Sequence, residues 1–297
     1  MLKQRLMFGP LLVLAVVAAV WLDELIQNAT VGWFNLERGL PGVLVLPVLV
    51  AAVVLATREI APIFRAVETR ASKRVLTASA LLGLFATAFT PQQVAAFSGV
   101  SIVCTSAIVV LVGAMLFYSR HKTTEGVVAA TAAALTMFVY LGLLLGFLFL
   151  LRKEFSGWHL LAIVLVTKSY DIGAYATGRA VGKHKLIPWL SPGKTWEGLA
   201  GGAALAALVA LAVNAAAQAA GAVTGLTSWQ AALIGLLLGL VGQMGDLVAS
   251  VFKRDAGVKD YSKTLPGFGG VMDVLDSPLL VAPVAYWMLV SMSSAAA

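Results

Sequence analysis

The chain has 297 residues, of which 60% are apolar and only 12% charged, and its mean hydropathy is +0.92. Soluble domains carry about 25% charged residues, so this composition excludes a disordered chain, a coiled coil and an ordinary soluble enzyme. The net charge of +7 does not indicate a nucleic-acid binder, because a basic surplus in so apolar a chain is typical of cytoplasmic loops. The single cysteine, Cys104, excludes a disulfide framework. We therefore predict a polytopic membrane protein that binds no nucleic acid.

Nine apolar runs are candidates for helices that cross the hydrocarbon core. A core about 30 Å thick requires roughly 20 residues of helix. In chain order the predicted spans are 7–25, 41–57, 75–90, 99–118, 126–150, 158–177, 196–218, 229–252 and 273–292. The third is short for a span, and the fifth is long enough to tilt or kink. Since the pattern lacks the dyad alternation of a membrane barrel, we expect an all-α protein with about nine transmembrane helices.

The distribution of basic residues predicts the orientation. If the N-terminus is cytoplasmic and nine spans follow, the inside segments carry 17 Lys and Arg and the outside segments carry 3. Cytoplasmic loops of membrane proteins hold such an excess of cations. The sequence therefore predicts a cytoplasmic N-terminus and a C-terminus outside.

The first half of the chain, residues 1–150, is expected to be a scaffold of transmembrane helices. Its predicted spans have no ionisable residue in their middles. The basic loop from Arg58 to Arg74 has two interpretations: contact with anionic lipid headgroups, or a plain determinant of topology.

The second half, residues 151–297, carries acids in or at the ends of its predicted spans: Asp171, Glu197, Asp246, Asp273 and Asp276, with Lys168 nearby. A carboxylate near the bilayer centre costs about 2.5–3.5 kcal/mol on insertion scales, so such residues mark a functional site. Small residues also recur here at a spacing of four, as Gly198 with Gly202 and Gly235 with Gly239. These pairs predict close helix packing and leave a homodimer open.

Three segments of the second half place carboxylates beside cations and glycines. They run from Asp171 to Gly198, from Gly245 to Arg254 and from Lys259 to Asp276. Carboxylates at such helix ends suit Mg²⁺, while cations and glycine N–H groups suit phosphates. The candidate phosphate-binding residues are Arg179, Lys183, Lys194, Ser250, Lys253, Arg254, Lys259, Lys263, Gly269 and Gly270. The combination is typical of phosphoryl or nucleotidyl transfer at a membrane surface.

The tripeptide Gly193-Lys194-Thr195 matches the end of a P-loop but does not make one. The position of the first glycine holds Pro188, and we predict no strand before it. We expect instead a helix that is capped by Ser191 and has Pro192 in its first turn. Lys194 and Glu197, so close to the start of a span, also suit a phosphate and metal role.

The same segments resemble the phosphatidate cytidylyltransferase family. The resemblance rests on Ser250-Val251-Phe252-Lys253-Arg254, Lys259-Asp260, Leu265-Pro266-Gly267-x-Gly269-Gly270, Asp273 and Asp276, and on the Ser-Pro-x-Lys-Thr-x-Glu-Gly element that begins at Ser191. It covers residues 168–277, and in the first half only the hydropathy is similar. It implies an integral enzyme, of the bacterial inner membrane and facing the cytoplasm, that joins CTP to phosphatidic acid and releases pyrophosphate and CDP-diacylglycerol.

The resemblance also implies roles for individual residues. Asp246 and Asp273 match the aspartate pair that holds Mg²⁺ in that family, with a second cation such as K⁺ alongside, and Lys253 and Arg254 complete the catalytic set. Further acidic positions of the motifs, and so further metal ligands, are Asp171, Asp260 and Asp276.

Two family residues are replaced in this chain, a His by Phe268 and an Arg by Val274. Because the carboxylates and the Lys-Arg pair are kept, we expect a divergent active enzyme, without a claim to a His-dependent proton role. His184 has two interpretations, a substitute for the missing His or an ordinary surface residue of a loop. Two alternatives stay open: a cytidylyltransferase for another lipid phosphate, such as an isoprenoid one, and an ion-coupled transporter with Lys168, Asp171 and Asp246 as ion ligands. A CDP-alcohol phosphotransferase is disfavoured because its aspartate pattern is absent.

Overall fold

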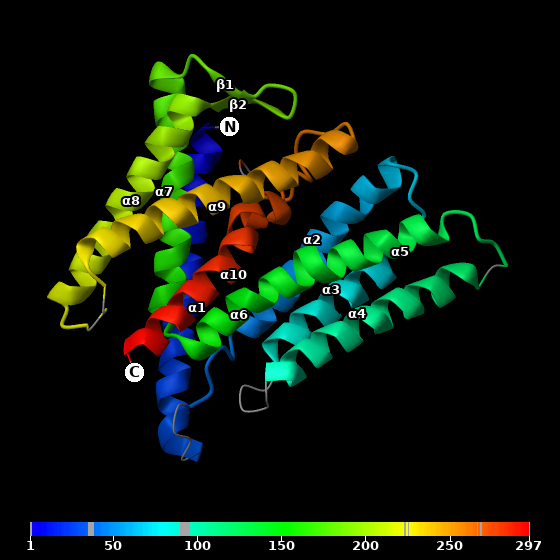
Figure 1. The fold of residues 1–297 in the computed structure, drawn as a ribbon, viewed down its shortest axis with the longest axis horizontal. Coiled ribbons are helices and arrows are strands. Elements are labelled where there is room, and N and C mark those ends of the chain that lie inside the picture. The colour runs from blue at the N-terminus through cyan, green and yellow to red at the C-terminus, as the bar shows by residue number, and fades with distance from the viewer. Residues whose placement is uncertain are drawn as a thin grey trace. The chain divides into compact units, whose positions relative to one another are not determined.

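Figure 1 shows the protein as a computed structural model that is dominated by helices. The structure describes residues 2–34, 39–89, 96–120, 122–222, 224, 226–265, 267 and 269–296. Its helices are α1 (Leu2–Phe34), α2 (Val45–Ala66), α3 (Lys73–Ala88), α4 (Ala96–Ser119), α5 (Val127–Thr136), the π-helical η1 (Met137–Leu143), α6 (Leu144–Glu154), α7 (Gly157–Val181), α8 (Trp196–Ala219), α9 (Ser228–Asp255) and α10 (Val271–Ala296). Two short strands, β1 (Lys185–Ile187) and β2 (Ser191–Thr195), separate α7 from α8.

Eight helical stretches within the described residues are long and apolar enough to cross a membrane. They account for eight of the nine predicted spans and confirm an all-α polytopic membrane protein. The remaining prediction, 75–90, falls on α3, whose 16 residues extend about 24 Å, less than the hydrocarbon thickness of about 30 Å. The orientation of the termini stays a prediction, because the alternation of sides depends on whether α3 crosses.

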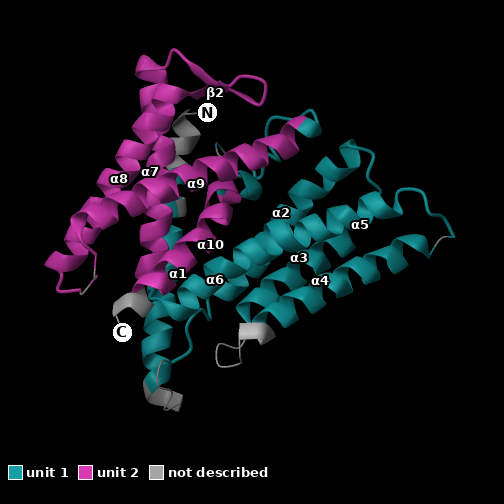
Figure 2. Cartoon of the chain, in the orientation of Figure 1, with its two compact units in different colours: residues 1–157, 255–274 teal, residues 158–254, 275–297 magenta. Residues whose placement is uncertain are grey.

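The chain divides into two compact units, coloured separately in Figure 2. Unit 1 comprises residues 1–157 and 255–274, and unit 2 comprises residues 158–254 and 275–297. The predicted division into a scaffold of residues 1–150 and a catalytic region of residues 151–297 stays a prediction. However, residues 255–274, which carry part of the signature, belong to the unit formed by the first helices.

In unit 1, α3 packs closely against the π-helical segment of the long span Val127–Glu154. A Cβ added at Gly83 would collide with the Phe138 carbonyl, and one at Gly142 with the Ala80 carbonyl. Single π-helical turns interrupt α-helices and widen them locally. The sequence predicted a span long enough to kink, and the structure locates its irregularity at η1.

Unit 1 also contains a buried ionic cluster that the sequence did not predict. Helix α1 continues through Asp23, whose carboxylate is fully buried. Asp23 Oδ2 lies 2.5 Å from Arg152 Nε and accepts a hydrogen bond from Gly42 N, while Oδ1 accepts one from Leu44 N. A buried ion pair offsets its desolvation only when such additional hydrogen bonds are made, so this cluster ties α1 to α6 and to the connection before α2.

In unit 2, glycines on one face of α9 allow three helices to approach it. A Cβ at Gly235 would meet Ala206 of α8, one at Gly239 would meet Tyr170 of α7, and one at Gly245 would collide with the Asp276 carbonyl of α10. On α8, Gly202 in turn lies against the Tyr170 carbonyl. The glycine pairs are therefore used in packing within the chain, as expected for small-xxx-small motifs. They give no separate support to the homodimer, which stays a prediction.

The connection from α7 to α8 differs from the prediction. Residues 191–195 form the strand β2, which pairs with β1 as an antiparallel hairpin, so Ser191 does not begin a helix. Helix α8 begins at Trp196, and its cap is Thr195, whose Oγ1 accepts a hydrogen bond from Gly198 N at 3.0 Å. The P-loop was rejected correctly for its missing glycine, but the expectation that no strand precedes it was wrong.

Candidate active site in unit 2

The carboxylate of Asp246 forms an ion pair with Lys194 within unit 2. Lys194 Nζ lies 2.6 Å from Asp246 Oδ2, and the two side chains are 17% and 32% exposed. Lys194 extends from β2 one residue before the cap of α8, whereas Asp246 lies on α9. The β-hairpin therefore brings a phosphate-binding candidate to a metal-binding candidate.

Helices α9 and α10 surround Asp246 with further candidate residues. Ser250 follows Asp246 by four residues and Lys253 follows Ser250 by three, so both share the face of α9 that carries Asp246. Both are buried, and Lys253 interacts electrostatically with Asp246. Since Gly245 allows the backbone of α10 to approach, the carboxyl group of Asp276 also interacts with that of Asp246. Two carboxyl groups and two lysines thus gather at one point of unit 2.

Asp171 belongs to the same group of charges. Its Oδ2 accepts a hydrogen bond from Lys168 Nζ at 3.3 Å, one turn earlier on α7. Asp171 also lies within electrostatic reach of Asp246 and Lys194. The structure therefore brings together Asp171, Asp246 and Asp276, three of the five aspartates predicted as metal ligands.

Asp273 lies in the part of the chain that belongs to unit 1, in the first turn of α10. Its Oδ2 accepts hydrogen bonds from Gly270 N at 2.9 Å and from Tyr261 N at 3.2 Å. The Gly269 N–H donates to the Leu265 carbonyl at 3.1 Å. Both glycine N–H groups that the sequence assigned to phosphate thus have protein acceptors in this structure, and that assignment stays a prediction.

Glu59 of α2 organises the same signature segment, and sequence reasoning missed it. The buried carboxylate accepts hydrogen bonds from Val271 N at 3.0 Å, Met272 N at 2.9 Å and Ser262 Oγ at 2.7 Å. It therefore caps the N-terminus of α10, where a negative charge is favourable. A Cβ at Gly270 would collide with this carboxylate and displace it. The only signal in the sequence is an acid within a basic stretch, and Glu68 gives the same signal there.

Other candidate residues are more exposed or have structural partners. Arg254 Nε donates to the Leu190 carbonyl at 3.2 Å, and Arg179 donates to the Tyr175 hydroxyl at 3.0 Å. The exposed candidates are Arg179, Lys183, Arg254, Lys259, Asp260 and Lys263. Among the candidate cations, Lys194 and Lys253 are therefore better placed next to the Asp246 carboxylate than these exposed residues.

Phe268 and Val274 replace two residues of the family pattern, and the structure describes only the second of them. Phe268 lies outside the described residues, and Val274 lies in the first turns of α10. His184, the proposed substitute, is exposed, and its Nδ1 lies 2.6 Å from Glu197 Oε1. Glu197 also accepts hydrogen bonds from His184 N. Both side chains therefore connect the hairpin to α8, and neither is among the charges around Asp246.

The donors around Asp246 fit Mg²⁺. Among the described residues there is no group of three or more His, Cys, Asp or Glu side chains arranged to hold a metal ion. Mg²⁺ requires less than this, because it is commonly bound by one or two carboxylates with water and substrate phosphates as the other ligands. The adjacent carboxyl groups of Asp246 and Asp276 meet that requirement. The pairing of Asp246 with Asp273 stays a prediction.

Comparison with known proteins identifies the family. The chain belongs to the Cytidylyltransferase family, whose model matches residues 3–292. The resemblance inferred from the motifs is thereby confirmed.

Curated relatives match the chain over part of their length. A phosphatidate cytidylyltransferase of Mycobacterium bovis is 39% identical over 137 residues, which are 46% of this chain and 42% of the relative. One of Staphylococcus saprophyticus is 38% identical over 160 residues, 54% of this chain and 59% of the relative. The uncharacterized protein YnbB of Escherichia coli is 41% identical over 129 residues, 43% of this chain and 41% of the relative. The chain thus spans about half the length of the curated relatives it matches.

Proposed function

We propose that this membrane protein transfers the cytidylyl group of CTP to phosphatidic acid and forms CDP-diacylglycerol and pyrophosphate. The family match over residues 3–292 carries this proposal, and two of the relatives described above are named for this activity. The cluster of Lys194, Asp246 and Lys253 supports it, because it combines cations for phosphates with a carboxylate for a metal ion.

The reaction needs charge neutralisation and positioning more than acid–base catalysis. A phosphate oxygen of phosphatidic acid, already an anion at neutral pH, attacks the α-phosphorus of CTP. The new oxygen–phosphorus bond forms as the bond to the bridging oxygen breaks, and pyrophosphate leaves. Two anions must therefore be held in line at close range, which fixed cations accomplish.

Within unit 2, Lys194 and Lys253 are the residues best placed to hold the triphosphate. Lys253 is buried on α9, so its position is fixed, and Lys194 is held by the hairpin. Arg254, whose guanidinium is anchored to the Leu190 carbonyl, is the next candidate. Mg²⁺, bound by Asp246 with Asp276 or Asp273, would supply further neutralisation of the phosphates. A second cation, such as K⁺, is part of the proposal through the family resemblance alone.

We also propose that the site faces the cytoplasm of a bacterial inner membrane. CTP is available there, and the candidate cations lie in segments that the distribution of charge places on the cytoplasmic side. The substrates and the bilayer lipid are the partners that this function requires.

The test is an assay of the purified full chain in detergent with CTP labelled at the α-phosphate. We expect labelled CDP-diacylglycerol and an equal amount of pyrophosphate only when phosphatidic acid, Mg²⁺ and protein are all present. Parallel reactions with an isoprenoid phosphate test the alternative lipid. Transfer to that lipid alone would overturn the assignment of the substrate, and no transfer to any lipid would overturn the function.

The matched variants are Asp246→Asn and Asp255→Asn. Both replace an aspartate of α9 by its neutral isostere, but Asp255 is exposed at the end of the helix. We expect Asp246→Asn to lower turnover at least about 100-fold, by analogy with the loss of one electrostatic contact to a transition state. Asp255→Asn should retain activity. Equal activity of the two variants would contradict the proposed site.

A further inference from the structure

We infer that unit 1 carries a second phosphate-binding site, suited to the headgroup of an anionic phospholipid. Four cations line it: Arg65, Lys73, Arg74 and Arg120. This inference goes beyond the proposed function, since the residues proposed above to bind the triphosphate, Lys194, Lys253 and Arg254, all belong to unit 2.

The cations converge from three helices on one cavity of about 440 Å³. Arg65 lies in the last turn of α2, Lys73 and Arg74 lie in the first turn of α3, and Arg120 directly follows α4. Ser72 and Phe117 complete the lining, and among the described residues no carboxylate lines it. The helices thus bring residues 55 positions apart in the sequence to one concave, basic surface.

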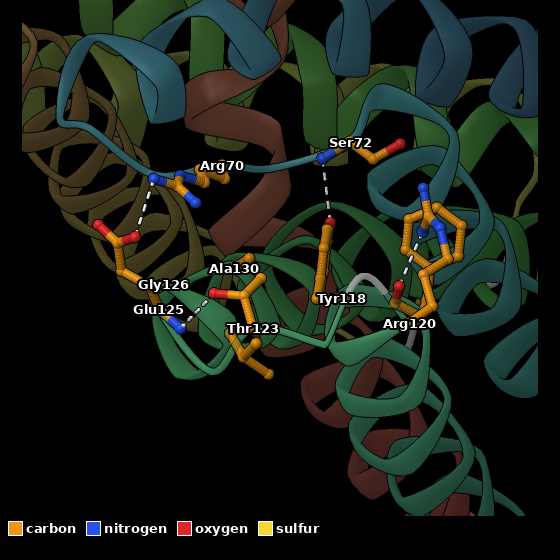
Figure 3. Close-up of a pocket in the computed structure, with 10 residues that line it drawn as sticks. Arg70, Ser72, Tyr118, Arg120, Thr123, Glu125, Gly126 and Ala130 are labelled. Atoms are coloured by element: carbon orange, nitrogen blue, oxygen red, sulfur yellow. Dashed lines mark hydrogen bonds and ion pairs between the residues drawn. The ribbon is translucent and has the colours of Figure 1, made fainter.

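An adjoining cavity of about 260 Å³ shares Ser72, Phe117 and Arg120 with the first and is shown in Figure 3. Its acid is Glu125, whose Oε2 pairs with Arg70 Nη2 at 3.1 Å. Among the described residues that line the two cavities, the one carboxylate is therefore paired with an arginine that does not line the larger cavity.

The position of Lys73 and Arg74 is electrostatically unfavourable without an anion. The N-terminus of a helix carries a partial positive charge and favours acids, not bases. Helix α3 has no acid in its first turn, and Ser72, its cap residue, makes no side-chain capping hydrogen bond. Four cations around one cavity repel one another as well. A bound phosphate would reverse each of these effects, because it is attracted both by the cations and by the helix terminus.

Local contacts hold the cavity in a defined shape. The Ser72 N–H donates to the Tyr118 hydroxyl at 3.0 Å, which fixes the start of α3 against α4 (Figure 3). Arg120 Nη1 donates to the Phe117 carbonyl at 2.7 Å, and its guanidinium lies 3.5 Å from the centroid of the Phe117 ring. An arginine that is already oriented loses less conformational freedom when it binds a phosphate.

A lipid headgroup is the source that the surroundings favour. The candidate spans Val45–Ala66 and Gly99–Ser119 end at this cavity, and Val127–Glu154 begins beside it. The ends of spans lie at the depth of the headgroups, where basic residues attract anionic lipids and where tyrosines such as Tyr118 are enriched. Soluble phosphate could bind the same cations, and the experiment below distinguishes it from a lipid headgroup.

The experiment measures lipid binding and thermal unfolding of the delipidated full chain in detergent, without CTP. The probes are phosphatidylglycerol, phosphatidylcholine and inorganic phosphate, each added separately. The variant Lys73→Gln/Arg74→Gln removes the two cations of α3. The control Arg58→Gln/Lys122→Gln removes two exposed cations that line neither cavity. Glutamine keeps helix propensity close to that of lysine and arginine, so without lipid the first variant should unfold at the same temperature as the original chain or higher.

We expect phosphatidylglycerol to bind the original chain and the control at least about ten-fold more tightly than phosphatidylcholine, and to raise their unfolding temperatures. The Lys73→Gln/Arg74→Gln variant should lose this preference. Stabilisation by inorganic phosphate equal to that by phosphatidylglycerol would assign the site to soluble phosphate and overturn the lipid source. An equal preference for phosphatidylglycerol in all three proteins would overturn the site itself. Since no turnover is measured, failure here leaves the proposed function untouched.

Discussion

Two ion pairs, one in each unit, differ in how completely the protein satisfies them. In unit 1, the Asp23 and Arg152 side chains are 0% and 1% exposed, and both oxygens of Asp23 accept backbone hydrogen bonds in addition to the arginine. In unit 2, Asp246 and Lys194 remain partly exposed, and a second acid, Asp276, lies beside the first. A saturated, fully buried pair has no capacity for a ligand, whereas an unsaturated, partly exposed pair beside a second acid does. The first pair therefore stabilises the fold and the second is suited to chemistry.

The largest effect on stability is expected from breaking the pair of unit 1. Arg152→Met leaves the Asp23 carboxylate buried without its counter-charge, so the free energy of unfolding should fall by about 3–5 kcal/mol. Unfolding in mixed detergent micelles measures this loss. The neighbouring change Lys153→Met serves as the control, because Lys153 Nζ makes only a 3.5 Å contact with the Ala88 carbonyl. Equal stability of the two variants would contradict a structural role for the pair.

An intermediate effect, on stability and turnover together, is expected for Glu59→Gln. The neutral amide weakens the acceptor for the N–H groups of Val271 and Met272, and loss of hydrogen bonds to a charged group costs about 1.5–3 kcal/mol. Because the same carboxylate holds the signature segment around Gly270, turnover per folded molecule should also fall.

The exposed change Glu68→Gln, in the connection after α2, is the control for Glu59→Gln. A comparison of kcat with the folded fraction separates positioning from stability. If Glu59→Gln keeps full turnover per folded molecule, Glu59 has no positioning role.

The smallest effect on the free energy of unfolding is expected from removing the cap of α8, which tests whether the helix begins at Trp196. Thr195→Ala removes the side chain that caps Gly198 N, which typically costs about 1 kcal/mol. Ser191→Ala, at the position that the sequence suggested as the cap, should change the free energy of unfolding by much less. A larger loss from Ser191→Ala would restore the original interpretation.

Hydropathy predicted the helices well because a span must be apolar over its whole length. The apolar run 75–90 is the one predicted span that is not among the eight candidate membrane-spanning helices of the described residues. It lies on α3, a helix of only 16 residues. The predicted end of the first span at residue 25 was wrong for a non-local reason. Helix α1 continues to Phe34, because Asp23 is neutralised by Arg152, 129 positions along the chain. No pattern in the sequence near Asp23 predicts that Arg152 is its partner.

The candidate site was predictable to the level of motifs but not of contacts. Asp246 and Lys194 stood out because charge is rare in this chain, and the structure pairs them directly. Glu59 did not, because isolated acids among basic residues, here Glu59 and Glu68, are also what an ordinary loop contains. The hairpin was missed because β1 has three residues and β2 has five, too short for a strand pattern, and because Pro192 also suits the first turn of a helix.

The most direct test of the central claim is a double-mutant cycle of turnover on Asp246→Asn and Lys194→Gln. Residues that act as one unit in catalysis have strongly non-additive effects. If the unit 2 pair binds and positions the reacting phosphates, each single change lowers turnover per folded molecule about 100-fold or more. The double variant then loses little beyond the worse single variant. Two results would contradict a catalytic role for this pair. The first is a loss of turnover in the double variant that equals the product of the two single losses. The second is a loss of turnover that only follows the loss of folded protein.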